Sequence, residues 1–503
     1  MVRAGRRRTA KPADREPGQR LLYRGGAYRP LSDTDCERII NSGYQILERI
    51  GINGAPVWLR NLLIEHGAKQ RDDGRLTFPQ SLVEAALVRS SRTVAIPGSD
   101  PQMGIEVGTN AVHIGTGGAA VQVLESNSGK YRDSTLSDLY GMMRVLNSCD
   151  SVHYGVRPLV ARDMQTSLDL DINTAYACMR ATGKPVGISF DQAQNVEPVC
   201  KLFDCALGSD GSFRKQPFCM AIIVHVVPPL CFAVEGADIM RAAIEAGMPL
   251  QICSAGQAGA TSPASLAGAL AQGLAESLAG MIVVDALKPG HPCIYAFMPF
   301  ISDLRTGAMT GGSGESAVAN AAAAQLLNQL ELPSTVSAGM TDSKSQDVQA
   351  GYEKAYSVSL AAHAGADMIN LSVGMLGSIM VASPEALVID NDMCAAILRS
   401  VRGIDVSDEL LDLETIERVV SGEGHYLGEQ QTLQLMKTEY LYPELGDRKS
   451  VPDWIDAGSP SIWDSACQQV KDILSQRPAG HIDDVADRKI RQHFDIKLTV
   501  DEL

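Results

Sequence analysis

From about residue 150 to residue 402 the 503-residue chain alternates between short apolar runs and longer helical segments, and this alternation restricts the possible fold most. The apolar runs have the length and bordering turn residues of buried strands, and the segments between them have helical spacing. The predicted strands are 152–155, 186–190, 219–227, 250–254, 293–297, 335–338 and 368–372. The predicted helices are 167–180, 195–207, 235–246, 263–284, 314–329, 347–364 and 384–401.

Seven strand–helix units in a row predict a parallel sheet, because parallel neighbours need a crossover connection of this kind. Eight units close a (β/α)₈ TIM barrel, and the sequence does not locate the eighth strand. A doubly wound open sheet is the alternative, but no GxGxxG motif opens a strand-to-helix turn. We therefore expect an α/β fold with a TIM barrel over residues 150–402.

Three segments flank the predicted barrel. Residues 1–24 hold eight basic and two acidic side chains with few apolar ones, which is typical of a flexible, solvated arm. Residues 25–149 are expected to pack on the barrel as helices near 31–47, 57–63 and 82–88, followed by a β-ribbon over 104–124. Residues 403–503 are expected to form a helical extension that covers one side of the barrel, with helices at 410–420 and 463–474.

Composition excludes several classes of protein. A formal charge of −15 argues against a nucleic-acid surface, and 45% hydrophobic with 20% charged residues is ordinary for a soluble protein. No uninterrupted apolar run approaches the ~20 residues that span a bilayer, so no membrane partner is expected. The eleven cysteines include no CxxC pair, which indicates neither a disulfide framework nor a zinc ribbon. We expect a cytoplasmic enzyme that associates as a homodimer.

In barrel enzymes the active site lies at the C-terminal ends of the strands, so the residues there are the candidates. They are Tyr154, Arg157, Phe190, Asp191, His225, Ser254, Gln257, Phe297, Asp303, Arg305, Met340, Thr341, Asp342, Lys344 and Asn370. This set contains neither a Cys/His nucleophile pair nor a closely spaced pair of histidine ligands.

Two glycine-rich segments are candidate ligand loops. The segment 307–315, with Gly311, Gly312 and Gly314, joins a strand to an alanine-rich helix, and is either a mobile loop with an anion site at the helix start or a plain surface loop. The segment 115–118 and the neighbouring His113 are better explained by a hairpin turn and a packed histidine than by a phosphate site.

A zinc-dependent methyltransferase is one alternative function, because a His-x-Cys pair with a later cysteine is used for zinc by such enzymes on barrels. His291, Cys293 and Cys394 are the nominal ligands. The first two residues, however, begin the fifth predicted strand, at the end of the barrel opposite to the catalytic face. We therefore expect no metal site in this chain.

Several ordered segments resemble the trimethylamine methyltransferase family. The residues that carry the resemblance are 297–309 (FMPFISDLRTGAM), 340–344 (MTDSK), 349–353 (QAGYE), 389–392 (IDND), 401–405 (VRGID), 424–427 (GHYL) and 442–448 (YPELGDR). The similarity extends over roughly residues 30–475.

The resemblance implies a barrel enzyme that transfers a methyl group from an amine to the Co(I) corrinoid of a separate small protein, with no cofactor bound tightly to this chain. Archetypal members contain pyrrolysine, whereas this chain contains only standard residues. That difference points to the branch that resembles quaternary-amine demethylases, above all those that convert glycine betaine to dimethylglycine. A non-catalytic betaine sensor is the second alternative.

For this function we expect aromatic faces to hold the cation, since each contributes roughly 0.5–2 kcal/mol. No catalytic acid is assigned, because the tertiary amine leaves as a neutral molecule. The expected substrate residues are Tyr154, Phe190, Phe297 and Tyr352 for the cation, Asp191 and Asp342 for negative charge, His225, Arg305 and Lys344 for a carboxylate, and Gln257. Gly311, Gly312 and Gly314 are expected to face the corrinoid.

Overall fold

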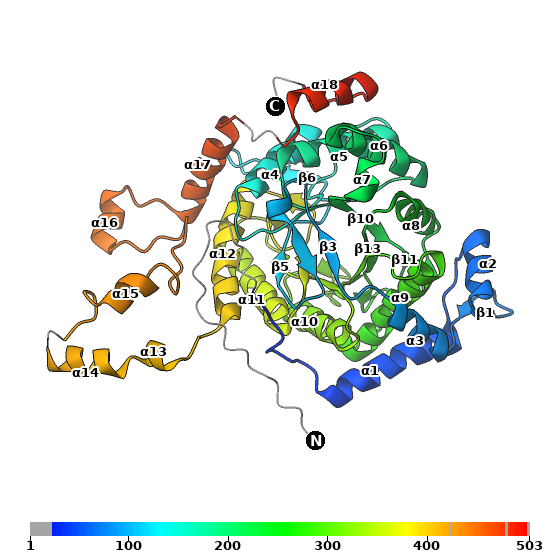
Figure 1. The fold of residues 1–503 in the computed structure, drawn as a ribbon, viewed down its shortest axis with the longest axis horizontal. Coiled ribbons are helices and arrows are strands. Elements are labelled where there is room, and N and C mark those ends of the chain that lie inside the picture. Colours follow the sequence, from blue (N-terminus) through cyan, green and yellow to red (C-terminus); the bar gives the residue numbers. More distant parts are fainter. Residues whose placement is uncertain (1–22, 423, 478–480, 500–503) are drawn as a thin grey trace.

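The computed structural model describes residues 23–422, 424–477 and 481–499, and its centre is a parallel sheet ringed by helices (Figure 1). The eight strands in spatial order are β5 (His113–Ile114), β19 (Met368–Asn370), β18 (Ser334–Ser337), β15 (Cys293–Phe297), β13 (Leu250–Ser254), β10 (Cys219–Val224), β9 (Val186–Ile188) and β8 (Gly155–Val156). A parallel bridge between Gly115 and Tyr154 joins the two ends of this order, next to β5 and β8. The expected TIM-barrel fold is therefore confirmed.

The strand that the sequence does not locate is β5, and it precedes the other seven. The prediction of a separate β-ribbon over 104–124 is wrong at this point, because His113 and Ile114 pair with β19 inside the barrel sheet. The crossover helix of this first unit is α4 (Leu136–Asn147), which begins with a capping box formed by Thr135 and Asp138. The division of the chain into domains at residues 24, 149 and 402 stays a prediction.

The outer ring consists of the helices that follow the strands. Besides α4 these are α5 (Ser167–Ala181), α6 (Val196–Leu207), α8 (Val234–Ala246), α9 (Leu266–Leu287), α10 (Gly314–Gln329), α11 (Val348–Ala364) and α12 (Pro384–Arg402), with a short α7 (Ser212–Lys215) after α6. Among the described residues, α9 is the one helix that is long and apolar enough to cross a membrane, and 89% of its apolar window is buried inside the protein. It is a core helix.

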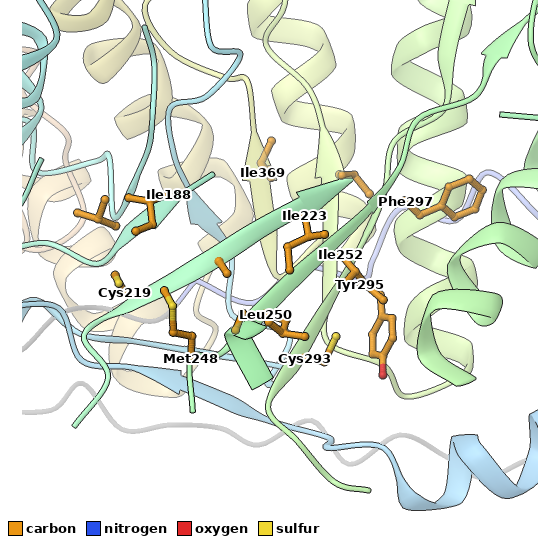
Figure 2. Packing of buried hydrophobic residues seen from close by; sticks show 14 of the residues in the cluster. Ile188, Cys219, Ile223, Met248, Leu250, Ile252, Cys293, Tyr295, Phe297 and Ile369 are labelled. Carbon is orange, nitrogen blue, oxygen red and sulfur yellow. The ribbon is translucent and has the colours of Figure 1, made fainter. Parts of the chain in front are cut away.

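Side chains of the strands alternate between the helix layer and the barrel interior. Figure 2 shows part of the outward set, which includes Ile223, Ile252 and Tyr295. The innermost set near the strand starts is Tyr154, Met220, Ile294 and Met368, one from each alternate strand, as barrel layers require. It packs on the hairpin of β3 (Val94–Ile96) and β4 (Ile105–Val107), which closes the N-terminal end of the barrel.

At the other end, the loops after the strands form short strands of their own. One small sheet consists of β14 (Gln257–Ala258), β16 (Phe300–Ser302) and β17 (Met309–Thr310); a second consists of β20 (Met375–Leu376), β21 (Val381–Ala382), β6 (Gln122–Leu124) and β7 (Tyr131–Asp133); a third pairs β11 (Val226–Val227) with β12 (Cys231–Phe232). Because these sheets follow the C-terminal ends of the barrel strands, they build the catalytic face of the barrel.

The N-terminal helices pack along α9, as expected. They are α1 (Asp33–Gln45), a π-helical turn (Ile46–Ile50), α2 (Val57–Glu65) and α3 (Gln80–Arg89), with β1 (Lys69–Gln70) and β2 (Leu76–Thr77) between α2 and α3. Ser32 caps α1 at its N-terminus. The basic arm predicted for residues 1–24 lies outside the described residues up to residue 22.

The C-terminal extension is helical, as predicted, but it covers the barrel only in part. Helices α17 (Ile462–Ser475) and α18 (Asp484–His493) pack on the barrel helices α12 and α6, respectively. Residues 403–461, which we call the C-terminal arm, instead project away from the barrel (Figure 1). The arm contains α13 (Asp408–Leu411), α14 (Leu413–Ser421), α15 (Gln430–Leu435) and α16 (Val451–Asp456).

Candidate active site

Inward-facing apolar side chains line the catalytic end of the barrel on one side. They come from three neighbouring strands, β10, β13 and β15, and from the residues that follow β15. This set, which we call the apolar wall, consists of Ile222, Cys253, Ala296, Met298 and Phe300. None of these side chains carries a charge, so the wall suits an apolar group such as a methyl.

Gln257 lies at the edge of the apolar wall. It is the register partner of Phe300 in the parallel pair of β14 and β16. Its Nε2 donates a hydrogen bond of 2.8 Å to the Ser302 hydroxyl, which fixes the amide in place. Of the predicted substrate residues, Gln257 is the one that lies directly against this wall.

A second group of residues ties three loops of the catalytic face together. The Asp342 carboxylate accepts a 2.9 Å hydrogen bond from the Gly311 backbone N–H and further bonds from the Thr310 and Ser378 hydroxyls. These partners follow β15 and β19, whereas Asp342 follows β18. We call Asp342 with Thr310, Gly311 and Ser378 the loop clamp, because one half-buried carboxylate positions all three loops.

Glu353 on α11 stabilises the loop clamp through hydrogen bonds to the segment that contains Asp342. Its Oε2 accepts hydrogen bonds from the Thr341 hydroxyl at 2.6 Å and from the Asp342 backbone N–H at 2.8 Å. The same oxygen lies 2.2 Å from where a Cβ on Gly312 would stand, so only glycine fits at that position. Tyr356 donates to the Gly312 carbonyl, and burial raises the pKa of this phenol to about 12.

The glycine segment is therefore not the mobile loop that its composition suggests. Gly311 and Gly312 are buried, and a Cβ on Gly311 would come within 2.6 Å of the Met340 side chain. Gly314 differs, since it is exposed at the start of α10 with open space around it. Of the three glycines, only Gly314 is exposed.

Three predicted substrate residues lie behind the barrel wall, under the outer helices. Phe297 is directed toward a neighbouring helix in Figure 2, and its ring would contact a Cβ on Gly273 of α9 at 2.3 Å. His225 donates a 2.9 Å hydrogen bond from Nε2 to the Glu276 backbone carbonyl, and burial lowers its pKa to about 4. Phe190 is buried in the same outer core. Their strand positions are outward ones, so these residues do not line the site.

Tyr154 lies deep inside the barrel rather than at its mouth. It is fully buried, its hydroxyl donates to Oδ1 of Asn370, and burial raises its pKa well above the ordinary value. Its ring also fills the space that the absent side chain of Gly115 leaves. We assign Tyr154 to the barrel core below the apolar wall.

The remaining predicted substrate residues lie on the surface of the catalytic face. Arg305 is 88% exposed and pairs with Asp303 at 2.7 Å. Lys344 donates to the Asp342 backbone carbonyl at 2.6 Å, so it joins the loop clamp at its outer edge. Tyr352 on α11 is 56% exposed, and Asp191 is exposed after β9.

The nominal zinc ligands are not brought together. His291 bonds to the Met248 carbonyl at 2.8 Å, Cys293 begins β15, and Cys394 lies in α12 among different neighbours. Across the described ranges, no group of three or more His, Cys, Asp or Glu side chains is arranged to hold a metal ion.

Sequence reasoning misses both the apolar wall and the partners of Asp342. Met298 and Phe300 stand one and three residues past Phe297, and no signal in an all-apolar strand tells which of its residues face inward. Thr310 and Ser378 are 32 and 36 residues from Asp342, and loop hydrogen bonds leave no periodic pattern.

Comparison with known proteins finds methyltransferases that are similar to this chain over most of its length. The trimethylamine methyltransferase of Desulfitobacterium hafniense is 28% identical over 445 residues, which cover 88% of this chain and 89% of that protein. The glycine betaine methyltransferase of another strain of this species is 26% identical over 428 residues, covering 85% and 88%. Among solved structures, a dihydropteroate synthase from Xanthomonas albilineans covers 62% of this chain and all of its own, at 12% identity and a TM-score of 0.35. Since the family model described as Trimethylamine methyltransferase (MTTB) matches residues 2–498, the chain belongs to that family of methyltransferases.

Proposed function

We propose that this methyltransferase demethylates a quaternary amine, with glycine betaine as the best candidate and dimethylglycine as its product. The methyl acceptor is the Co(I) corrinoid of a separate small protein. The observation that carries the proposal is the uncharged apolar wall at the catalytic end of the barrel, which matches the methyl groups of a quaternary ammonium. The similarity to a protein named glycine betaine methyltransferase supports the same substrate class.

The chemistry requires little from the protein beyond positioning. The C–N bond breaks with its electron pair on nitrogen, so the leaving group is a neutral tertiary amine and needs no proton. The corrinoid, when bound, supplies the nucleophilic electron pair that accepts the methyl group. The residues of this chain then have to hold the cation, align one methyl and exclude water.

Phe300 is the aromatic side chain suited to hold the cation. It is half-buried in the apolar wall beside Met298, and its backbone pairs with Gln257. A ring face near a quaternary ammonium contributes roughly 0.5–2 kcal/mol, more where water is excluded. Phe300 thus takes the role that the sequence suggested for Phe297.

A betaine carboxylate needs a cationic donor near the mouth. Arg305 and Lys344 remain the candidates, because both follow strands at the catalytic face. Substitution of Arg305 by Ala is expected to raise the KM for glycine betaine and to leave the KM for a choline-type amine unchanged. An unchanged KM for glycine betaine would remove Arg305 from this role.

The corrinoid protein is expected to dock on the catalytic face. Large apolar side chains are exposed there at four places, which are the end of β10, two loops and the start of α11: Val224 at 55%, Leu304 at 70%, Met380 at 52%, Val348 at 86% and Tyr352 at 56%. Exposed apolar groups spread around one mouth fit a protein surface better than a small molecule. Gly314 lies at the same end and leaves space for the approach.

The test mixes the pure enzyme with Co(I) cobalamin or its corrinoid protein and a panel of methylated amines. Glycine betaine should consume the Co(I) absorbance and release dimethylglycine in equal amount. If no quaternary amine reacts, or trimethylamine alone does, the proposal is wrong. Tight betaine binding without transfer would indicate a sensor, and stoichiometric zinc in active protein would indicate the zinc-dependent alternative.

We place the enzyme in the cytoplasm, which its eleven free cysteines support.

A further inference from the structure

One polar side chain lies among apolar ones in the interior of the barrel. The layer nearest the strand starts consists of Tyr154, Met220, Ile294 and Met368. Side chains two residues further along a strand point to the same side, so the same four strands supply the next layer. It consists of Val156, Ile222, Ala296 and Asn370. Since β19 and β10 are four strands apart in the closed order of eight, Asn370 lies opposite Ile222 of the apolar wall.

The amide of Asn370 is held through its oxygen, whereas its nitrogen has no partner. Oδ1 accepts the hydrogen bond of the Tyr154 hydroxyl, which fixes the orientation of the amide. Within the described ranges Nδ2 makes no hydrogen bond, although only 2% of the residue is exposed. Buried amide N–H groups nearly always have a partner, so buried donors without one indicate a place for a ligand.

The space inside the barrel above this layer, which we call the bore, is open to solvent. Ile222 is partly exposed although it points inward, and Val224, the next inward residue of β10, is 55% exposed. Ser189, which follows the neighbouring strand β9, is partly exposed as well. The hairpin of β3 and β4 closes the opposite end of the barrel. A ligand therefore reaches Asn370 from the catalytic face.

We propose that Asn370 binds the carboxylate of a betaine whose trimethylammonium group lies against the apolar wall. This anchor rests on the proposed function, which brings a carboxylate and a quaternary ammonium into the bore as one molecule. Nδ2 has two N–H groups that can donate to the carboxylate oxygens. A carboxylate at the inner end of the bore also directs the N-methyl groups toward the mouth, where the methyl acceptor arrives.

A neutral amide suffices as the anchor because a betaine has no net charge. In glycine betaine a single methylene separates the carboxylate from the ammonium, so the two charges compensate each other within the ligand. A cationic side chain in place of Asn370 would repel the ammonium. Arg305 and Lys344 lie at the rim, where they attract the carboxylate before it enters the bore. They act on the capture of the substrate, and Asn370 acts on its bound orientation.

The test measures the Kd of two quaternary amines by isothermal titration calorimetry, without any corrinoid. Glycine betaine has the carboxylate, and tetramethylammonium lacks it. Asn370→Asp keeps the size of the side chain and an acceptor for the Tyr154 hydroxyl, but it replaces the N–H donors by a carboxylate oxygen. We expect the Kd of glycine betaine to rise by about tenfold or more, because a bond to a charged group is lost. The Kd of tetramethylammonium should fall or stay unchanged.

Asn173→Asp is the matched control. Asn173 is also fully buried, but on α5 outside the barrel sheet, where its Nδ2 donates to the carbonyls of Asp169 and Asp495. This change should leave the ratio of the two Kd values as in the wild type. Tyr154→Phe removes the hydroxyl that orients the Asn370 amide, so it should weaken glycine betaine alone, by about three- to tenfold. It also serves as the test variant if Asn370→Asp does not fold.

The anchor is wrong if Asn370→Asp, or Tyr154→Phe in its place, binds glycine betaine as tightly as the wild type does. A loss of affinity for both amines by the same factor would also overturn it. If the wild type demethylates glycine betaine in either case, the proposed function stands and the anchor alone is rejected. A wild type that does not bind glycine betaine at all would overturn the proposed function and the anchor together.

Discussion

Gly115 and Tyr154 close the barrel together. They form the parallel bridge between the first and second strands, and a Cβ on Gly115 would lie 2.3 Å from the Tyr154 ring. The tyrosine hydroxyl also donates to Asn370 on β19, the strand that pairs with β5 on its other side. The missing side chain of one residue is therefore the space in which the other residue packs.

Substitution of Gly115 by Ala should destabilise the protein by about 1–3 kcal/mol, because the methyl group overpacks a fully buried ring. Gly351→Ala is the matched control, since this glycine lies in α11 with nothing within 4 Å of an added Cβ. The control should be neutral or more stable by about 0.5–1 kcal/mol, as alanine favours helices. Denaturant unfolding measures both. Equal midpoints for the two variants would contradict the conclusion that the Tyr154 ring needs the space beside Gly115.

The seven later barrel strands and their helices were predictable because long segments with one period leave a strong signal. β15 and α10 match the predicted bounds residue for residue. The sequence does not identify β5 as a barrel strand, because its crossover contains the antiparallel pair of β6 and β7 before α4, so that residues 104–124 have the pattern of a separate β-ribbon.

The candidate site was predictable only as a location. The predicted strand ends lie within three residues of the observed ones, but the strand Cys293–Phe297 is apolar on both faces, as strands covered on both sides are. Sequence therefore could not decide that Phe297 faces α9 while Met298 and Phe300 join the apolar wall. The sequence predicts that residues 403–461 cover the barrel, whereas they project away from it. Apolar residues at helical spacing indicate that one face of a helix is covered, but they do not identify the surface that covers it.

His225 gives the protein an expected acid sensitivity. Burial lowers its pKa from 6.5 to about 4, so between these values the unfolded chain binds a proton that the folded chain excludes. The free energy of unfolding should therefore fall as the pH drops from 6.5 toward 4, by about 3 kcal/mol for this residue, and be unaffected by it above pH 7. Urea unfolding at several pH values measures the slope. In His225→Gln this part of the slope should vanish; an unchanged slope would show that other groups cause it.

Asp342→Asn should impair methyl transfer more than stability. The amide nitrogen cannot accept a hydrogen bond, so Gly311, Thr310 or Ser378 loses its partner and the loops of the catalytic face loosen. Loss of one charge-assisted bond predicts a decrease of about tenfold or more in kcat/KM. Asp204→Asn is the control, because Asp204 on α6 also accepts hydrogen bonds, two of 2.8 Å from the backbone N–H groups of Gly211 and Phe213, but in the segment before β10 at the opposite end of the barrel. A similar loss of activity in both variants would contradict the prediction that Asp342 acts by positioning the loops of the catalytic face.

Phe300→Leu and Phe297→Leu separate cation binding from core packing. Both changes replace a ring by a similar apolar volume, but only Phe300 belongs to the apolar wall, whereas Phe297 packs against Gly273. Loss of the ring face should raise the KM of Phe300→Leu for the quaternary amine by roughly three- to thirtyfold, which corresponds to about 0.5–2 kcal/mol. Phe297→Leu should instead lower the unfolding midpoint and leave the KM unchanged, because its ring contacts only the helix layer. Steady-state kinetics and thermal unfolding on the two variants, with the wild type alongside, distinguish the roles. The reverse pattern would assign cation binding to Phe297. Helix α9, which covers the Phe297 ring, would then have to move when the amine binds.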